Sequence, residues 1–126
     1  MSVELNHTIV SARDREESAE FLAGVLGLKV GAPTGPFLPL TTGNGVTLDF
    51  ATVPAGQEVA GQHYAFLLSE DAFDASFARI RAQGLDYWAD PAGALPGEIN
   101  HRGGGRGCYF RDPSGHWMEI FTRGSG

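Results

Sequence analysis

The sequence has little cysteine, little positive charge and no long apolar run. Cys108 is the single cysteine among 126 residues, which excludes an internal disulfide. Nine lysines and arginines stand against fifteen acidic residues, and the formal net charge of −6 disfavours nucleic acid and anionic membrane surfaces as partners. No apolar segment is long enough to cross a bilayer and no secretory signal is evident, so we expect a cytoplasmic protein.

The chain resembles itself when its two halves are aligned. Asn44–Phe50 matches Ser114–Ile120, with Asp49 and Glu119 in register 70 positions apart. His7 and His63 form a second matched pair, 56 positions apart. Each half therefore offers one histidine near its start and one acid near its end. The length suits one domain with a real core, and we predict a single domain, 1–126, built from two modules at 1–55 and 61–126.

The order of helical and strand patterns predicts the same βαβββ plan in both modules. Apolar stripes that end at glycine predict helices over 14–26 and from Ser69 or Asp71 to 83. The predicted strands of the first module are 3–10, 28–30, 37–41 and 46–53. Those of the second module are 63–68, 86–89, 107–111 and 116–122. Residues 92–105 form a long glycine-rich loop, which is either mobile or functional.

The alternation of side chains along the strands separates polar candidates from the core. Asp49 and Glu119 each lie between two bulky apolar residues, so the carboxylates face away from the side that packs under the helices. His63 also faces away from the bulky residues of its strand, and His7 should share that face by the internal symmetry. Two imidazoles with one or two carboxylates suit a divalent metal ion, because they combine neutral nitrogen donors with anionic oxygen.

Three segments carry a resemblance to a known family. The doubled βαβββ plan with His7, the sequence at 62–66 and above all the segment 109–120 resemble the vicinal oxygen chelate superfamily. This superfamily includes glyoxalase I, bleomycin-resistance proteins, fosfomycin-resistance thiol transferases and extradiol dioxygenases. The resemblance implies an α+β fold with a curved mixed sheet around a cleft, and a metal held by His7, His63 and Glu119. It also implies a homodimer in which His7 of one subunit meets His63 and Glu119 of the other.

The resemblance implies a metal-dependent enzyme, with two alternatives. We expect a lyase or isomerase that coordinates a small oxygen-bearing substrate and stabilises an enolate or oxyanion, with Glu119 and Asp49 as candidate catalytic residues. Asp49 stands where glyoxalase I has a ligand glutamate, so it is a fourth ligand or acts through water. The metal is zinc, nickel, manganese or iron. The alternatives are a metal-free protein that sequesters a toxic compound, as bleomycin-resistance proteins do, and a one-domain iron(II) dioxygenase. Ile9 occupies the position of a catalytic threonine of the fosfomycin enzymes, which disfavours that activity.

Six further residues are candidate substrate contacts: His101, Arg102, Arg106, Tyr109, Phe37 and Trp88. The first three surround a glycine run, where they either hold a substrate anion or belong to a solvated loop. The three aromatic residues either line a pocket or belong to the core. His116 faces the side opposite to Glu119 and is expected to be structural, and Cys108 is expected in the core rather than as a nucleophile.

Overall fold

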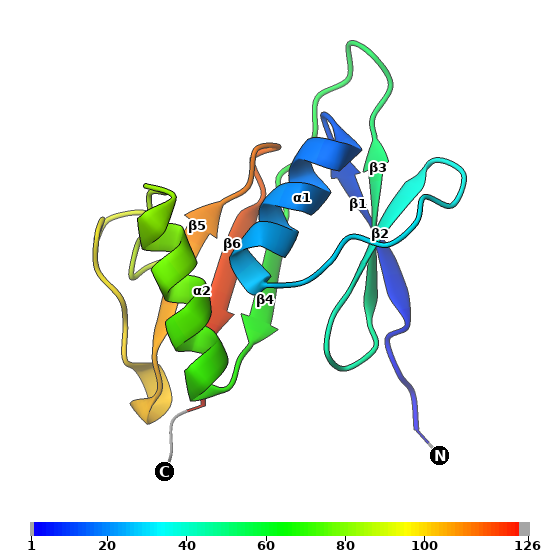
Figure 1. Ribbon diagram of the computed structural model, residues 1–126. Coiled ribbons are helices and arrows are strands. Elements are labelled where there is room, and N and C mark those ends of the chain that lie inside the picture. Colours follow the sequence, from blue (N-terminus) through cyan, green and yellow to red (C-terminus); the bar gives the residue numbers. More distant parts are fainter. Residues whose placement is uncertain (1, 124–126) are drawn as a thin grey trace. The chain divides into compact units, whose positions relative to one another are not determined.

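The computed structural model (Figure 1) describes residues 2–123, and its contacts divide the chain into two compact units, 1–60 and 61–126. Met1 and 124–126, which the predicted domain includes, lie outside the described residues. Each unit contains one α-helix and a three-stranded sheet. The predicted α+β class is therefore confirmed. No helix within residues 2–123 is both long and apolar enough to cross a membrane.

The first unit follows the order strand, helix, strand, strand. Its elements are β1 (His7–Ala12), α1 (Arg15–Leu26), β2 (Phe37–Thr41) and β3 (Thr47–Thr52). Strand β3 lies in the middle of the sheet, parallel to β1 and antiparallel to β2. Helix α1 contacts all three strands of this sheet.

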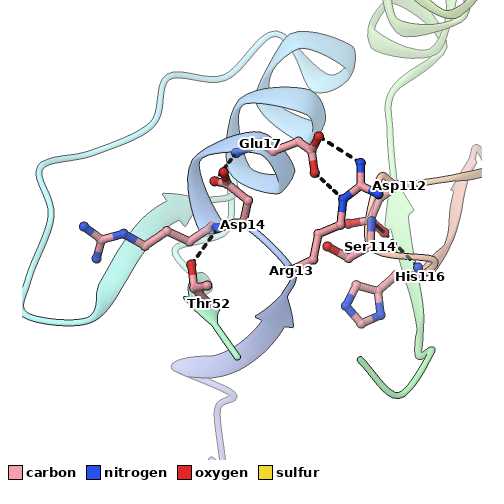
Figure 2. Close-up of polar contacts among 8 residues, drawn as sticks. Arg13, Asp14, Glu17, Thr52, Asp112, Ser114 and His116 are labelled. Atoms are coloured by element: carbon pink, nitrogen blue, oxygen red, sulfur yellow. Dashed lines mark hydrogen bonds and ion pairs between the residues drawn. The ribbon is translucent and has the colours of Figure 1, made fainter. Parts of the chain in front are cut away.

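Helix α1 begins and ends where the sequence predicts, and Figure 2 shows the contacts at its start. The Asp14 side chain accepts a hydrogen bond from the backbone N–H of Glu17 at 3.1 Å, which caps the first turn. Arg13 forms an ion pair with Glu17 at 2.6 Å, and the Thr52 hydroxyl accepts from the backbone N–H of Arg15 at 3.0 Å. The helix stops at Gly27, whose φ of 71° is the left-handed conformation that glycine adopts without strain.

The second unit repeats this plan with a longer connection. Its elements are β4 (His63–Leu67), α2 (Glu70–Ala82), the short 3-10 helix η1 (Arg102–Gly104), β5 (Gly107–Arg111) and β6 (Trp117–Phe121). Strand β6 lies in the middle, parallel to β4 and antiparallel to β5, and α2 lies across this sheet (Figure 1). Ser69 caps α2 by accepting from the N–H of Ala72 at 3.1 Å, so the first of the two predicted caps is confirmed.

The core of each unit lies on one face of its sheet, as the alternation of side chains predicts. In the first unit the buried residues include Val10, Leu22, Val25, Leu38, Leu40, Leu48 and Phe50. In the second unit they include Phe73, Ile80, Cys108, Phe110, Met118 and Ile120. The candidate ligands lie on the opposite face of each sheet: His7 and Asp49 in the first unit, and His63 and Glu119 in the second.

The second predicted strand of each module, 28–30 in the first and 86–89 in the second, is wrong. In 28–30, the N–H of Leu28 bonds back to the Ala23 carbonyl at 3.0 Å as part of the end of α1, which removes it from any ladder. In 86–89, a single bridge pairs Trp88 with Tyr109, and no ladder extends from it. Pro91, which lacks an N–H, follows closely. Each unit is thus βαββ.

Candidate functional site

The same register in both sheets places a histidine and an acid on one face. In the first unit His7 is opposite Thr47 and Ile9 is opposite Asp49 on the parallel strands β1 and β3. In the second unit, on β4 and β6, His63 is opposite Trp117 and Ala65 is opposite Glu119. Residues two positions apart on a strand share a face, so each histidine lies on the same face as its acid. The internal repeat therefore extends to the positions of the candidate ligands.

In the second unit the histidine and the acid touch. The Nε2 atom of His63 is 3.1 Å from the Oε1 atom of Glu119. The side chain of His63 is 46% exposed and that of Glu119 is 17% exposed, so both remain accessible to a ligand. Two donor atoms bound to one metal at about 2.1 Å each are separated by about 3 Å, so this spacing matches a shared ion.

The hydrogen bonds of the histidines fix which nitrogen is available. The Nδ1 atom of His63 lies 3.1 Å from the carbonyl oxygen of Trp117, and a carbonyl only accepts, so Nδ1 carries the proton. In the neutral ring, Nε2 is then an acceptor, and it faces a carboxylate that is also an acceptor. A proton or a metal ion must lie between them. In His7, Nδ1 likewise lies 2.8 Å from the Asn6 side-chain oxygen, so Nε2 is the nitrogen that remains available.

Tyr109 and Arg102 lie beside this pair. Tyr109 on β5 is the direct cross-strand partner of Glu119, and it is 3% exposed. Its hydroxyl accepts a hydrogen bond from Nη1 of Arg102 at 3.1 Å. Burial raises the pKa of the Tyr109 hydroxyl and the charge of Glu119 adds to the rise, so the hydroxyl stays protonated at neutral pH. The structure thus brings together His63, Glu119, Tyr109 and Arg102.

A row of aromatic rings continues from Tyr109, and it includes Trp117, which was not among the candidates predicted from the sequence. Trp117 stacks with Tyr109 at 6.1 Å and contacts Trp88 at 5.1 Å between ring centroids. Its indole N–H donates to the carbonyl of Pro91. The available signal was the position of Trp117 two residues before Glu119, which puts both side chains on one face. Trp88 therefore lies with the site residues through Trp117.

The other two loop candidates have different surroundings. The Arg106 guanidinium pairs with Glu70 at 2.9 Å and Asp74 at 2.7 Å, and lies 4.5 Å from the ring centre of Phe73. These contacts hold the start of β5 to helix α2, so a substrate would have to compete with two carboxylates for Arg106. His101 is exposed at the start of η1.

Asp49 and Phe37 lie in the first unit, on the face of its sheet that carries His7. Asp49 is half-buried and pairs with Pro39 across the antiparallel strands, and Phe37 pairs with Ala51. Ile9, the partner of Asp49 on β1, is 56% exposed.

A pocket of about 380 Å³ opens beside Glu119 within the second unit. Its lining combines three arginines with one carboxylate and an aromatic ring: Asn100, Arg102, Gly103, Arg106, Glu119, Phe121, Thr122 and Arg123. Residues 2–123 contain no preassembled group of three or more metal-ligating side chains. The contact between His63 and Glu119 therefore involves two candidate ligands, and the ligand set of His7, His63 and Glu119 stays a prediction.

His116 and Cys108 have structural surroundings. His116 is fully buried, and its Nδ1 accepts from the backbone N–H of Gln62 at 3.0 Å. The backbone N–H of His116 donates to the Asp112 carboxylate at 2.7 Å, within the turn that leads into β6 (Figure 2). The pKa of the Cys108 thiol is raised to about 12, mainly by burial and to a lesser extent by the charge of Glu119. The thiolate, which is the nucleophile, is therefore not formed at neutral pH. Both sequence-based interpretations are confirmed.

A comparison with protein families decides the assignment. A sequence model described as the Glyoxalase/Bleomycin resistance protein/Dioxygenase superfamily matches residues 4–120. The chain belongs to this superfamily. The resemblance inferred from segment 109–120 is therefore confirmed, and so is the glyoxalase-type fold.

Individual members of the superfamily resemble the chain over most of its length. The chain is 30% identical over 121 residues to the glutathione transferase FosA of Serratia marcescens, covering 92% of this chain and 78% of FosA. It is 56% identical to the solved structure of oxidase ChaP-H2, with a TM-score of 0.94 and coverage of 100% and 98%. Oxidase ChaP-H1 is 54% identical, with a TM-score of 0.91 and coverage of 99% of both chains. These relatives support a metal-dependent enzyme that modifies small molecules.

Proposed function

We propose that this protein is a metal-dependent oxidase that acts on a small oxygen-bearing organic substrate, with dioxygen as the oxidant. The two relatives described as oxidases are 56% and 54% identical to the chain, whereas FosA is 30% identical. This difference favours oxidation over the thiol transfer named for FosA. It also supports the iron(II) oxygenase alternative over the lyase or isomerase expected from the sequence.

The observation that carries the proposal is the contact between Nε2 of His63 and Oε1 of Glu119. Two acceptors at 3.1 Å need a cation between them, and the bond from Nδ1 of His63 to a backbone carbonyl is the orientation that metal-binding histidines adopt. Two histidines with one carboxylate leave coordination positions open, as in non-haem iron oxygenases. We therefore propose His7, His63 and Glu119 as the ligand set. When bound, the metal would act as a redox-active Lewis acid for the oxidation of the substrate by dioxygen.

The remaining residues of the second unit would shape the environment of this ligand pair. Tyr109 packs against Glu119 and excludes water from one side of the carboxylate. Trp117 and Trp88 extend an aromatic surface against which a flat substrate would stack. Arg102 holds the Tyr109 hydroxyl and keeps its other N–H groups for polar contacts.

We also propose that the protein forms a homodimer in which His7 of one subunit completes the site of the other. The exposed Leu5 and Ile9 flank His7 on the same face of the first unit, and an apolar face of this kind gains stability when a partner covers it. Metal binding should then strengthen association. Light scattering at micromolar concentration, with and without metal, tests this: a monomer under both conditions contradicts it.

The function is tested with protein purified without chelators or added metal. Metal analysis should find about one ion per chain, and iron(II) added under anaerobic conditions should restore it to chelated protein. Oxygen consumption is then followed with an oxygen electrode while small phenols and enols are screened. Binding of zinc or nickel without oxygen consumption would contradict the oxidase. Failure to bind any divalent metal, with retained binding of a hydrophobic ligand, would favour sequestration.

One observation supports a lyase or isomerase as a second candidate. Asp49 occupies in the first unit the register position that Glu119 occupies in the second, so a second carboxylate is available as a fourth ligand. Four protein ligands suit a Lewis acid that stabilises an enolate, the glyoxalase-like chemistry. The effect of Asp49→Ala on metal binding separates the two candidates.

A further inference from the structure

The lining of the pocket beside Glu119 contains three arginines, and they differ in whether a carboxylate pairs with them. Arg106 is paired with Glu70 and Asp74. Across residues 2–123, by contrast, no carboxylate pairs with Arg102 or Arg123. These two guanidinium groups are therefore the ones available to an anion that enters the pocket.

Arg102 is held in a defined place by an anchored loop. The backbone N–H of Arg102 donates to the Asn100 side-chain oxygen at 3.3 Å, and the Asn100 amide donates to the Ala89 carbonyl at 2.8 Å. Asn100 and Gly107 exchange two backbone hydrogen bonds, at 2.8 and 3.0 Å. A Cβ atom at Gly107 would lie 3.0 Å from the Asn100 side-chain oxygen, so glycine lets the Asn100 side chain keep this position without a displacement.

The guanidinium of Arg102 donates a hydrogen bond through one of its nitrogen atoms, Nη1. Nη1 of Arg102 donates to the Tyr109 hydroxyl at 3.1 Å, and the Cζ atom of Arg102 lies 5.9 Å from the centre of the Tyr109 ring. A guanidinium has five N–H donors in a planar fork, which matches an anionic oxygen in one or two contacts. Tyr109 is the cross-strand neighbour of Glu119, so the guanidinium of Arg102 and the proposed metal ligand both lie beside Tyr109, and both line the pocket.

We propose that Arg102 is the specificity residue of this pocket and binds an anionic oxygen of the substrate, carried by a small organic acid or by an ionised phenol or enol. The pocket of about 380 Å³ is large enough for a molecule with one ring, and Phe121 provides an apolar wall for it. This inference rests on the proposed function for the location of the site. It adds the charge of the substrate and the residue that recognises it.

The test measures binding rather than turnover. Benzoate and the neutral benzamide, which have nearly the same shape, are titrated into the full-length protein as purified and after chelation, with the fluorescence of Trp88 and Trp117 as the signal. Benzoate should bind at least about tenfold more tightly than benzamide, the factor that one charge-assisted hydrogen bond provides. Para-nitrophenolate in its ionised form, titrated in parallel, identifies which source of the anionic oxygen the pocket prefers.

Two variants make the test specific. Arg102→Gln should weaken benzoate binding about tenfold and leave benzamide unchanged, and Arg102→Lys should recover part of the loss. Arg81→Gln is the matched control, because Arg81 lies in the last turn of α2, is absent from the pocket lining and is also exposed. It should bind both compounds like the unaltered protein.

The proposal is overturned if Arg102→Gln binds benzoate as tightly as the unaltered protein, if benzamide binds as tightly as benzoate, or if benzoate does not bind at all. The metal content of Arg102→Gln should equal that of the unaltered protein. Failure of the anion pocket and failure of the metal site therefore give different results, because benzoate binding is measured on chelated protein and metal content is measured without benzoate.

Discussion

The two units share one backbone plan but carry different chemistry on it. At the register position where the first unit has Asp49 opposite Pro39, the second has Glu119 opposite Tyr109. The partner of His7 is Thr47, whereas the partner of His63 is the large ring of Trp117. The first unit therefore presents a sparse face with one imidazole and one short carboxylate. The second presents a crowded aromatic and cationic face.

This difference separates the features that both units share from those that only the second unit has. The register of the parallel strands places a histidine and an acid on the same face in both units, so the positions of the proposed ligands follow from the backbone plan. Only the second unit has the aromatic row of Tyr109, Trp117 and Trp88 and the pocket residue Arg102. These residues lie on β5, on β6 and in the long loop before β5. We infer that the second unit recognises the substrate and that the first contributes His7.

The largest expected difference between residues concerns metal binding. His63→Ala and Glu119→Ala should each lower metal affinity on the order of 100-fold or more, since each removes a ligand and even supporting residues cost 10- to 100-fold. Calorimetric titration with manganese(II) or anaerobic iron(II) measures the change. The matched control is His101→Ala, an exposed histidine outside the proposed ligand set, which should bind metal normally. Equal affinity in His63→Ala and His101→Ala would contradict the ligand assignment.

The next effect separates two histidines of the same unit. His116→Ala should lower the free energy of unfolding by about 2–3 kcal/mol, because it opens a cavity and leaves the N–H of Gln62 without its acceptor. His63→Ala removes a half-exposed side chain and should cost less than about 0.5 kcal/mol. Urea denaturation of metal-free protein compares them. A larger loss of stability in His63→Ala would mean that His63 is a structural residue.

A smaller effect tests whether the two acids are equivalent. Asp49→Ala should lower metal affinity by less than about tenfold if a water molecule fills the fourth position, since Asp49 then acts only through hydrogen bonds. A loss as large as that of Glu119→Ala would establish four protein ligands and favour the lyase or isomerase. The same titration as for Glu119→Ala gives the answer. Glu98→Ala, an exposed acid outside the proposed site, serves as the control.

The sequence predicted the helices and the faces of the strands because these depend on local patterns. Asp14 and Gly27 mark the ends of α1, and the apolar neighbours of Asp49 and Glu119 give the orientation of both carboxylates. The strand at 28–30 was wrong because pairing depends on partners that are distant in sequence. The role of Arg102 could not be separated from that of Arg106 for the same reason. Only the folded structure shows that Arg106 pairs with Glu70 and Asp74, and that no carboxylate within residues 2–123 pairs with Arg102.

The smallest effect tests how far the repeat extends into the turns before β3 and β6. The N–H of Gly45 bonds to the Thr42 carbonyl and that of Gly115 to the Asp112 carbonyl, each at 3.0 Å, and the two glycines have φ of 82° and 90°. A Cβ atom would meet nothing within 4 Å at either position, so the cost of alanine comes from the backbone conformation alone. Gly45→Ala and Gly115→Ala should therefore each lower the free energy of unfolding by about 1 kcal/mol.

Gly43→Ala is the control for both variants, because Gly43 lies in the same turn as Gly45, has open space around it and does not have a positive φ. It should be neutral or slightly stabilising, since alanine reduces the freedom of the unfolded chain. Urea denaturation measures all three variants. Equal losses in Gly45→Ala and Gly115→Ala would show that the turns are equivalent although their side chains differ. A loss in Gly43→Ala of the same size would show that general changes in the loop, rather than left-handed backbone, cause the effect.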